Sequence, residues 1–328
     1  MPVALITGGA GFIGSHTAER FLAEGWTVHL IDNFVTGKRE NLPSAATVHA
    51  LDIGDARAAD LVRQLEPRVL VNLAAQMDVR KSVADPVFDA RTNILGSLNL
   101  LEAVRHHSPA TRVVFSSTGG VIYGDRTTPP NVETFEKNPD SPYAIAKLSV
   151  ELYQSYYARI HGLDTVALRF GNVFGPRQDP HGEAGVVAIF CGRLLDKKPL
   201  TVFGDGRQTR DYVFVSDVVE ATWRASTRPL PEPALVDSRA FNIGTGVGTP
   251  VIRIAEVLQK VSGVTAAVEY APHRPGEQQQ SFVDVRKAAA LLDWRPGVSL
   301  EEGLARSYAW FAARHAGHST TSNPHLTT

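Results

Sequence analysis

The sequence has little of what marks three classes of protein. Its 328 residues include one cysteine, Cys191, which excludes an intrachain disulfide and fits a reducing compartment such as the cytoplasm. Its 33 Lys and Arg against 34 Asp and Glu give a net charge of −1, which leaves no basic excess for binding nucleic-acid phosphates. No apolar run reaches the ~20 residues of a membrane span. We therefore expect a cytoplasmic protein that binds neither nucleic acid nor membrane.

Signals for export and for metal binding are also missing. The opening apolar run, residues 3–7, has neither a basic leader nor a cleavage site, so we expect no signal peptide. No group of Cys and His residues has the spacing of metal ligands, so we expect no metal site. The length exceeds that of most single domains and 43% of the residues are apolar, which predicts one large or two intimately joined domains.

Strand-like apolar runs alternate with helical stretches through the first 175 residues. This alternation predicts a Rossmann-type α/β fold, in which a doubly wound parallel sheet carries helices on both faces. We assign residues 1–175 to this domain. The runs cover residues 3–7, 27–31, 47–51, 68–73, 112–116 and 165–170.

After residue 175 the pattern changes to clusters of Gly, Pro and Asp. We predict a smaller C-terminal α/β region over residues 176–314 that packs on the sheet. A tail at residues 315–328 is rich in Ser, Thr and His without periodicity, and we expect it to be disordered. The helices of the C-terminal region are expected at residues 184–195, 215–225, 250–261 and 300–314.

The stretch TGGAGFIGS, residues 7–15, follows the first run and opens a predicted helix. Gly8, Gly11 and Gly14 stand at G-x-x-G-x-x-G spacing, which allows a tight turn, close approach of a pyrophosphate and close helix-to-strand packing. Asp32 directly follows the second run, where its carboxylate can bind an adenosine ribose and repel a 2′-phosphate. The segment therefore predicts NAD rather than NADP, with the diphosphate on the helix N-terminus.

The residues that directly follow the other runs are expected at the same edge of the sheet, because ligands of open parallel sheets bind at the carboxyl ends of the strands. Asp52 and Ile53 follow the third run and are placed to contact adenine. Ala74, Ala75 and Gln76 follow the fourth run, and the small side chains of the two alanines let a cofactor lie against the backbone. Hydroxyl groups follow the fifth run.

The segment SPYAIAK, residues 141–147, places Tyr143 and Lys147 four residues apart on one face of a helix. The ammonium favours the phenolate and lowers the phenol pKa toward neutrality, which makes a general base. Ser117 or Thr118 supplies a hydrogen-bond donor for the reacting oxygen. The residues assigned to the cofactor are Gly8, Gly11, Phe12, Ile13, Gly14, Asp32, Asn33, Asp52, Ile53, Leu73, Ala74, Ala75, Gln76, Asn93, Tyr143 and Lys147.

These motifs occur in an order that resembles the NAD-dependent epimerase/dehydratase family of the extended short-chain dehydrogenases/reductases, and most of all the UDP-glucose 4-epimerases. The likeness runs from residue 1 to about residue 314 and includes LAAQ, FSSTGGVIYG, RFGNVFGPRQDP, VFGDGRQTRDYVFV, FNIGTG and HRPGE. The resemblance implies that Tyr143 takes a proton from a sugar hydroxyl, while Lys147 holds the nicotinamide ribose and tunes the tyrosine. Thr118 matches the hydroxyl member, although one extra residue before Tyr123 leaves Ser117 as an alternative.

The resemblance also implies the substrate. Arg210 and Arg274 match diphosphate-binding arginines, Glu277 matches an acid that binds the uridine ribose, and Asn172 matches an asparagine beside the diphosphate and the sugar. The implied reaction is C4 epimerisation of a UDP-hexose, UDP-glucose or UDP-galactose, through a 4-keto intermediate with NAD retained. The substrate contacts are assigned to Thr118, Tyr143, Asn172, Val187, Arg210, Arg274 and Glu277.

Several alternatives stay open at this point. Gly119 and Gly120 follow the hydroxyl member where related 4,6-dehydratases carry acids, which disfavours dehydration. Ser281 aligns with a bulky tyrosine of other epimerases, so an N-acetyl sugar such as UDP-GlcNAc is possible. Arg80 and Arg177 are candidates to meet the carboxylate of UDP-glucuronate. A net nucleotide-sugar oxidoreductase would share all the N-terminal chemistry.

Two predicted helices, residues 93–107 and 141–161, carry leucines beyond those that the site needs. These are Leu95, Leu98, Leu148 and Leu152. The family resemblance implies a homodimer in which such helices pair into a four-helix interface. The alternative is that these leucines face only the sheet.

Overall fold

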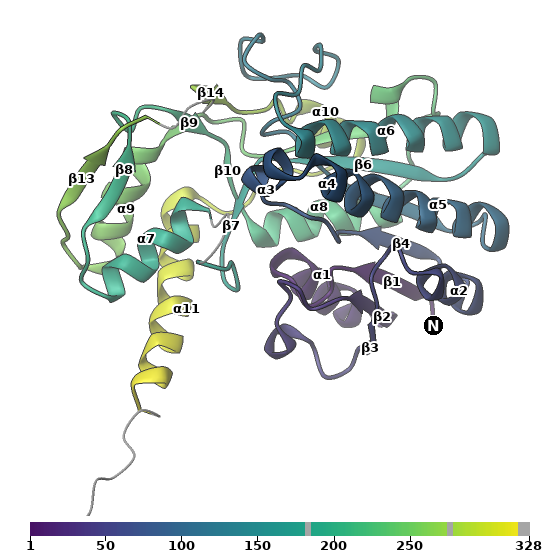
Figure 1. Cartoon of the computed structure of the whole chain (residues 1–328), viewed down its shortest axis with the longest axis horizontal. Coiled ribbons are helices and arrows are strands. Elements are labelled where there is room, and N and C mark those ends of the chain that lie inside the picture. The colour runs from purple at the N-terminus through teal and green to yellow at the C-terminus, as the bar shows by residue number, and fades with distance from the viewer. Residues whose placement is uncertain (181–184, 274–277, 321–328) are drawn as a thin grey trace, which may run out of the picture.

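The computed structural model describes residues 1–180, 185–273 and 278–320 and contains a seven-stranded parallel sheet (Figure 1). The strand order is β11-β6-β5-β4-β1-β2-β3, so the order reverses between β1 and β4, the point at which such sheets bind ligands. The predicted α/β doubly wound fold is confirmed. The strands are β1 (Val3–Thr7), β2 (Thr27–Asp32), β3 (Thr47–Ala50), β4 (Val69–Asn72), β5 (Arg112–Thr118), β6 (Thr165–Phe170) and β11 (Ala240–Ile243).

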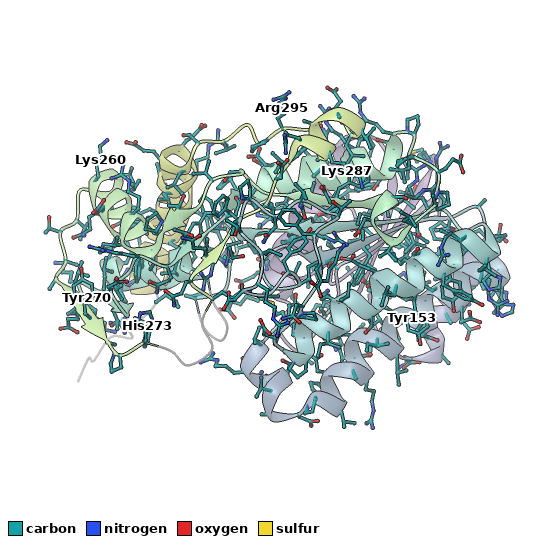
Figure 2. All side chains as sticks on the ribbon, turned by 90° about the horizontal axis from the view of Figure 1, so that it is seen from above. Tyr153, Lys260, Tyr270, His273, Lys287 and Arg295 are labelled. Atoms are coloured by element: carbon teal, nitrogen blue, oxygen red, sulfur yellow. The ribbon has the colours of Figure 1, made fainter. Side chains whose placement is uncertain are left out.

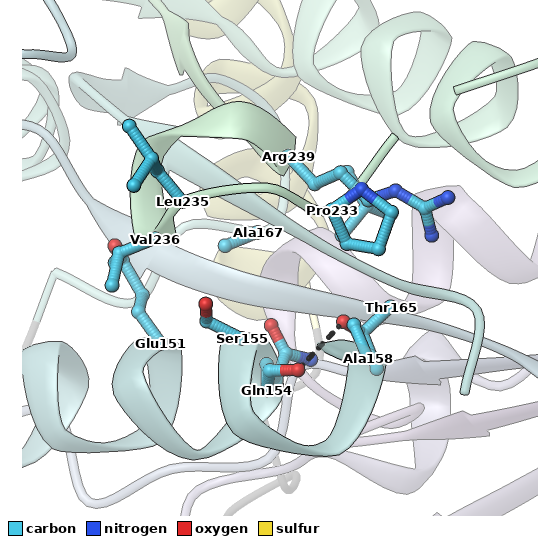
Figure 3. A pocket seen from close by; sticks show the side chains of 11 residues that line it. Glu151, Gln154, Ser155, Ala158, Thr165, Ala167, Pro233, Leu235, Val236 and Arg239 are labelled. Carbon is cyan, nitrogen blue, oxygen red and sulfur yellow. Dashed lines mark hydrogen bonds between the residues drawn. The ribbon is translucent and has the colours of Figure 1, made fainter. Parts of the chain in front are cut away.

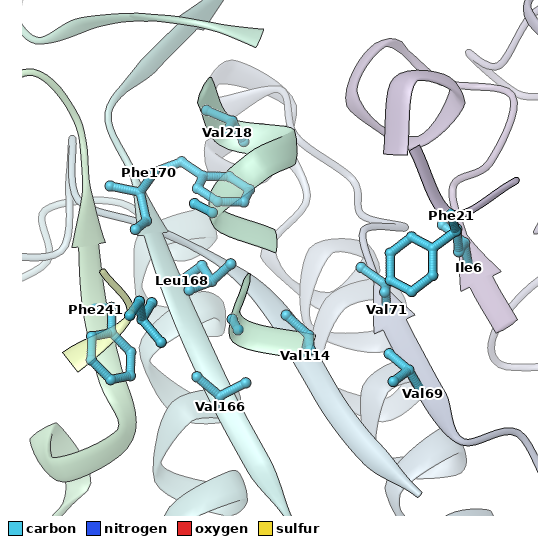
Figure 4. Close-up of a cluster of buried hydrophobic side chains, with 14 of the residues drawn as sticks. Ile6, Phe21, Val69, Val71, Val114, Val166, Leu168, Phe170, Val218 and Phe241 are labelled. Carbon is cyan, nitrogen blue, oxygen red and sulfur yellow. The ribbon is translucent and has the colours of Figure 1, made fainter. Parts of the chain in front are cut away.

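Helices cover both faces of the sheet. On one face α1 (Phe12–Ala23), α8 (Val215–Thr227) and α10 (Arg286–Leu291) pack on a large apolar core, where the rings of Phe21 and Phe241 are fully buried (Figure 4). On the other face lie α2 (Ala56–Leu65), α5 (Gly96–His107) and α6 (Pro142–His161). Side chains of a strand alternate between the two faces, and both faces are covered, which explains why mostly apolar runs form these strands.

Short helical pieces connect β4 to α5. They are α3 (Val79–Ala84), α4 (Pro86–Ala90) and a π-helical turn, η2 (Arg91–Leu95). The sequence predicts one helix over residues 93–107, whereas its first three residues belong to the π turn and α5 begins only at Gly96. π turns inside helices are often found at functional sites.

A second layer holds smaller sheets and a separate apolar core. Figure 2 shows Tyr270, on β13 in this layer, and Tyr153, on α6, at opposite ends of the molecule. The helices are α7 (Val186–Leu195), α9 (Val251–Ser262) and α11 (Leu300–Thr320). The strands of this layer are β7 (Asn172–Phe174), β8 (Leu200–Phe203), β9 (Thr209–Arg210), β10 (Tyr212–Phe214), β12 (Thr249–Pro250), β13 (Val268–Ala271) and β14 (Gln280–Ser281). Two 3-10 turns belong to the main layer: η1 (Arg39–Asn41), between β2 and β3, and η3 (Val236–Arg239), which contacts β6 and β11.

The structure corrects two boundaries. The last helix continues to Thr320, six residues beyond the predicted end at Arg314, so residues 315–320 are helical rather than part of a disordered tail. The helix predicted at residues 215–225 is expected in the C-terminal region, but as α8 it covers the main sheet beside α1. Among the described residues, no helix combines the length and the apolar character needed to cross a bilayer.

Candidate active site

The turn between β1 and α1 requires glycine, because a larger residue would not fit its backbone conformation or its close contacts. Gly8 has φ of 67°, in the left-handed region, and its N–H donates to the carbonyl of Ile31 at 2.8 Å. A Cβ at Gly14 would lie 2.0 Å from the Gly8 carbonyl oxygen, so no other residue fits there. Helix α1 begins after Gly11 without a side-chain cap. Its first N–H groups, at Phe12 and Ile13, therefore lie at a helix N-terminus suited to a phosphate.

Asp32 lies at the end of β2, next to this turn, and is 7% exposed. Its carboxylate accepts hydrogen bonds from the backbone N–H groups of Ala10 at 2.9 Å and Phe34 at 2.8 Å. A Cβ at Gly37 would lie 2.5 Å from Asp32 Oδ1, so the following loop folds tightly over the acid. The carboxylate thus holds both loops and places a negative charge where an adenosine ribose is expected.

The residues predicted to contact adenine are held by one another and by α5. Asn33 donates through Nδ2 to Asp52 Oδ2 at 2.8 Å, and Asp52 Oδ1 accepts from the Gly54 N–H at 2.8 Å. Ile53 is 3% exposed, and a Cβ at Gly96 would lie 2.7 Å from its Cγ1. Asn33 and Asp52 therefore form a polar rim, while most of the Ile53 side chain packs under the helix.

A threonine that the sequence analysis did not single out organises the end of β4. Thr7 Oγ1 donates to Asn72 Oδ1 at 2.8 Å and accepts from the N–H groups of Leu73 and Ala74 at 3.1 and 3.0 Å. These bonds bring the ends of β1 and β4 together at the switch point. The backbone of residues 73–75 therefore has a fixed place beside the glycine turn.

Gln76 and Asn93 exchange two hydrogen bonds across the site. The Gln76 N–H donates to Asn93 Oδ1 at 2.9 Å, and Asn93 Nδ2 donates to the Gln76 carbonyl at 2.9 Å. Asn93 is 3% exposed and lies in the π turn η2, which directs its side chain toward the strand end. Both residues also bind a buried carboxylate, Asp89, which the sequence analysis missed.

Tyr143 and Lys147 lie on α6 as predicted, with Lys147 Nζ 5.7 Å from the centroid of the Tyr143 ring. The helix begins at Ser141, whose Oγ accepts from the Ala144 N–H, and Pro142 occupies its first turn. Lys147 is 3% exposed and donates to the Ser116 carbonyl at 2.8 Å. Burial lowers the pKa of Lys147 to about 8, although the nearby acids Asp89 and Glu151 oppose this shift.

Ser117 and Thr118, the two candidates for the hydroxyl member, have different surroundings. Ser117 is 4% exposed, and its Oγ donates to the carboxylate of Glu151 inside the protein. A Cβ at Gly120 would lie 3.7 Å from both Thr118 Oγ1 and Asn172 Oδ1. The structure therefore gathers Thr118 and Asn172 around one space and engages Ser117 elsewhere.

Behind Ser117 lies a buried ionic network. Arg169 on β6 has a side chain that is 0% exposed and donates through Nη2 to Glu151 at 2.6 Å and to Asp237 at 2.7 Å. Its Nη1 donates to the hydroxyl of Tyr123 at 3.1 Å. The small cavity beside Glu151 measures about 10 Å³, room for about one water molecule, so it is not a ligand site (Figure 3).

Some of the residues predicted to bind the substrate lie within the described part of the chain, and others lie outside it. Arg210 on β9 donates through Nη1 to the carbonyls of Thr209 and Gln278 at 2.9 and 2.8 Å. Val187 on α7 is 1% exposed and packs in the apolar core of the second layer, so its side chain does not line an open site. Arg274 and Glu277 lie outside the described residues.

Ser281 links the second layer to the loop that follows β5, which contains Gly120. It is 3% exposed, pairs with Arg210 between strands β14 and β9, and donates through Oγ to the Gly120 carbonyl at 2.7 Å. Ser281 therefore lies beside the space shared by Thr118 and Asn172. A small side chain at this position leaves more room in that wall than a tyrosine would.

The two arginines considered for a uronate carboxylate have other partners. Arg177 donates to Glu19 and to Ser15 Oγ on α1. Arg80 lies 3.7 Å from Asp78 Oδ1, and its side chain is 69% exposed. Neither geometry places a cation beside Thr118.

With this geometry, the chain can be compared with known proteins. A family model described as GDP-mannose 4,6 dehydratase matches residues 5–307. The chain belongs to the NAD-dependent epimerase/dehydratase family. A UDP-glucose 4-epimerase of Mycolicibacterium smegmatis is 42% identical over 94% of this chain and 97% of that protein.

Two solved structures of family members are similar over nearly the whole chain. The UDP-glucose 4-epimerase of Thermotoga maritima with UDP-glucose has a TM-score of 0.90 and 43% identity, covering 95% of this chain and 99% of that one. The UDP-glucose 4-epimerase of Thermus thermophilus in complex with NAD has a TM-score of 0.87 and 42% identity, covering 94% and 98%. The expected family membership is thus confirmed.

Proposed function

We propose that the protein is an NAD-dependent isomerase that inverts C4 of a UDP-hexose, interconverting UDP-glucose and UDP-galactose through a 4-keto sugar. The observation that carries this proposal is the position of Lys147, which lies near the Tyr143 ring on α6 and donates to the Ser116 carbonyl, two residues before Thr118 at the end of β5. The 42–43% identity to UDP-glucose 4-epimerases over more than nine tenths of the chain supports the substrate class.

The residues present fit NAD. The Gly8 to Gly14 turn leaves its backbone open to a diphosphate, and the buried Asp32 carboxylate suits a ribose with free hydroxyls and repels a 2′-phosphate. Lys147 and Asn93 lie at the end of the site where the nicotinamide ribose is expected. When bound, NAD supplies a hydride acceptor at C4 and later the hydride donor.

The chain's own residues perform the proton chemistry. The Tyr143 phenolate takes the proton of the C4 hydroxyl and later returns it, so no net proton or electron is consumed. Lys147 stabilises the phenolate through its charge, and Thr118 donates a hydrogen bond to the reacting oxygen. Arg210 holds the diphosphate, so the keto sugar turns about its phosphate link and presents its other face.

Dehydration is disfavoured because there is too little room for an acidic side chain at the position of Gly119. A Cβ there would lie 2.8 Å from Val283 Cγ1 and 3.0 Å from the Arg169 carbonyl oxygen, so an acidic side chain does not fit without movement. A dehydratase needs an additional acid or base near C5 and C6. The site therefore favours oxidation and reduction at C4 alone.

A UDP-N-acetylhexosamine is the second candidate substrate, because the small side chain of Ser281 lies beside Gly120 where other epimerases carry a bulky tyrosine. UDP-glucuronate is less favoured, since Arg80 and Arg177 are engaged by Asp78 and Glu19. A net oxidoreductase is also less favoured, because the relatives named above are epimerases.

We also propose that the protein is a homodimer that works in the cytoplasm. Apolar side chains of three neighbouring elements are exposed, including Val87 (65%), Leu95 (58%), Leu152 (50%) and Ile160 (63%). They lie on α4, η2 and α6, which pack against one another. In the single chain, the apolar face that these side chains form is open to solvent. The single Cys191 is buried, as suits a reducing compartment. Light scattering of the parent and of Leu152→Glu would show whether this face pairs two chains.

The function is tested by incubating the purified protein separately with UDP-galactose, UDP-GalNAc and UDP-galacturonate, without added NAD, and following C4 epimers by NMR. We expect conversion of UDP-galactose without accumulation of NADH, and loss of conversion in Tyr143→Phe. Conversion of none of the three, even with NAD supplied, would reject the proposal. Accumulating NADH would point to a net oxidoreductase.

A further inference from the structure

Asp211 is a buried carboxylate in the second layer with no role in the chemistry described so far. It lies between β9 and β10 and is 1% exposed. Its Oδ1 accepts hydrogen bonds from the N–H and from the hydroxyl of Thr245, both at 2.6 Å. Its Oδ2 accepts from the N–H groups of Gly246 at 3.1 Å and Val283 at 3.2 Å. Because a buried charge is costly unless hydrogen bonds offset its loss of water, the carboxylate holds all four donors in place.

The main chain of Asp211 holds a third segment. Its carbonyl oxygen accepts from the Asn172 N–H at 2.7 Å. Two glycines let the backbone come this close: a Cβ at Gly171 would lie 2.8 Å from that oxygen, and a Cβ at Gly244 would lie 2.4 Å from Asp211 Oδ2. The motifs RFGN, TRDY and FNIGTG, which lie far apart in the sequence, therefore meet at one residue.

The segments that meet at Asp211 carry side chains of the substrate side of the site. Arg210 directly precedes Asp211, and the Asn172 N–H binds its carbonyl. Ser281 pairs with Arg210 between β14 and β9 and lies two residues before Val283. Strand β9 has two residues, and its pairing with β12 and β14 is equally short, so few ladder bonds hold it. The bonds to Asp211 therefore add to what keeps Arg210 in place.

We propose that Asp211 is a positioning residue for the nucleotide sugar, which fixes Arg210 relative to Asn172 so that both reach the ligand. This inference rests on the proposed function for the identity of the ligand, but not for the arrangement of the protein. Asp211 acts through its neighbours, because both of its carboxylate oxygens are buried and bind donors of the protein. A displaced Arg210 would bind the diphosphate less tightly, while the proton chemistry at Tyr143 would stay in place. Loss of the Asp211 carboxylate therefore weakens substrate binding rather than the chemical step.

The test disturbs this carboxylate and compares it with a second buried acid. In Asp211→Asn the amide oxygen can accept from one pair of donors, while the NH₂ group meets the other pair and cannot accept. Thr245→Val removes only the hydroxyl donor and serves if Asp211→Asn does not fold, and Thr245→Ser keeps that hydroxyl. The matched control is Asp217→Asn: Asp217 on α8 is 8% exposed and accepts through Oδ2 from the Val298 N–H at 3.1 Å, and neither residue belongs to the predicted substrate site.

The deciding readouts are kcat and KM for the converted UDP-sugar, and the Kd of UDP from calorimetry. We expect Asp211→Asn to raise KM and Kd about 10-fold with kcat nearly unchanged, and Thr245→Val to raise them less. Thr245→Ser and Asp217→Asn should match the parent. Parent-like KM and Kd in Asp211→Asn and Thr245→Val, or a fall in kcat alone, would overturn the proposal. An equal rise of KM in Asp217→Asn would also overturn it, because the effect would then follow from any lost buried acid.

Amide hydrogen exchange separates this inference from the proposed function. If the parent converts no UDP-sugar and binds no UDP, the proposed function is rejected, and exchange at residues 209–210 decides the role of Asp211. Faster exchange there in Asp211→Asn than in Asp217→Asn would uphold the positioning of Arg210 by Asp211. Equal exchange in the two variants would overturn it.

Discussion

The two layers of the molecule hold their site residues in different ways. In the sheet layer, Lys147, Thr118 and Asp32 lie on or directly after long elements, and buried hydrogen bonds fix them or their neighbours. In the second layer, Arg210 lies on a two-residue strand and is held by the carbonyl of Thr209 on that strand and by the carbonyl of Gln278 just before β14. Groups that take part in proton or hydride transfer need a fixed geometry. A cation that binds a diphosphate also acts through its charge, which tolerates a less exact position. Changes in the sheet layer should therefore affect kcat, and changes in the second layer KM.

The largest effect is expected from Tyr143→Phe, which removes the proposed general base and leaves the ring in place. We expect kcat to fall by about 10²- to 10⁴-fold with little change in KM or in bound NAD, because the phenol acts during proton transfer in the transition state. Steady-state kinetics and the absorbance ratio of the purified protein measure these quantities. A variant that keeps most of its kcat would assign the base to another residue.

In the second layer, Arg210→Gln should act mainly on KM. A hydrogen bond to a charged group contributes about 1.5–3 kcal/mol, so we expect KM for the UDP-sugar to rise about 10- to 100-fold. The control is Arg207→Gln, three residues earlier, where the arginine side chain is 87% exposed and should leave KM unchanged. A fall in kcat with KM unaffected would remove the proposed division between the layers.

The sheet could be predicted from the sequence because apolar runs of the right length are local signals. Strand β11 could not, since its four residues join the sheet only through pairing with β6, about 70 positions earlier in the chain. For the same reason the sequence places α8 in the wrong layer: its apolar face fits either core, and its packing against α1 decides. Long-range pairing leaves no pattern in a short window of sequence.

The placement of Tyr143 beside Lys147 was predictable because four-residue spacing on a helix fixes a shared face. The same rule places Glu151 beside Lys147, and an arginine inside the buried run TVALRF, Arg169, signals a buried partner. Both signals were present and were missed. Asp89 had no such signal, because the π turn that brings Asn93 to it has no sequence pattern of its own.

A pair of single substitutions sharpens the comparison within the sheet layer. We expect Thr118→Ala to lower kcat about 10-fold, since it removes one hydrogen bond to the reacting oxygen. Ser117→Ala should change kcat less but lower the free energy of unfolding by about 1 kcal/mol, because Glu151 loses a buried donor. Kinetics and urea unfolding of both variants separate the two effects. The reverse result, with kcat lost in Ser117→Ala, would make Ser117 the hydroxyl member.

The smallest effect is expected where the two layers meet. Ser281 on β14 donates to the Gly120 carbonyl at 2.7 Å, so this hydrogen bond joins the second layer to the loop that follows β5. Ser281→Ala leaves that half-buried carbonyl without this donor and should lower the free energy of unfolding by about 1 kcal/mol. Ser149→Ala is the control, because Ser149 donates within its own helix, to the Ile145 carbonyl, and alanine favours helix. If Ser281→Ala instead raises KM as strongly as Arg210→Gln, Ser281 contacts the substrate directly, and the boundary between the two layers runs through the sugar site.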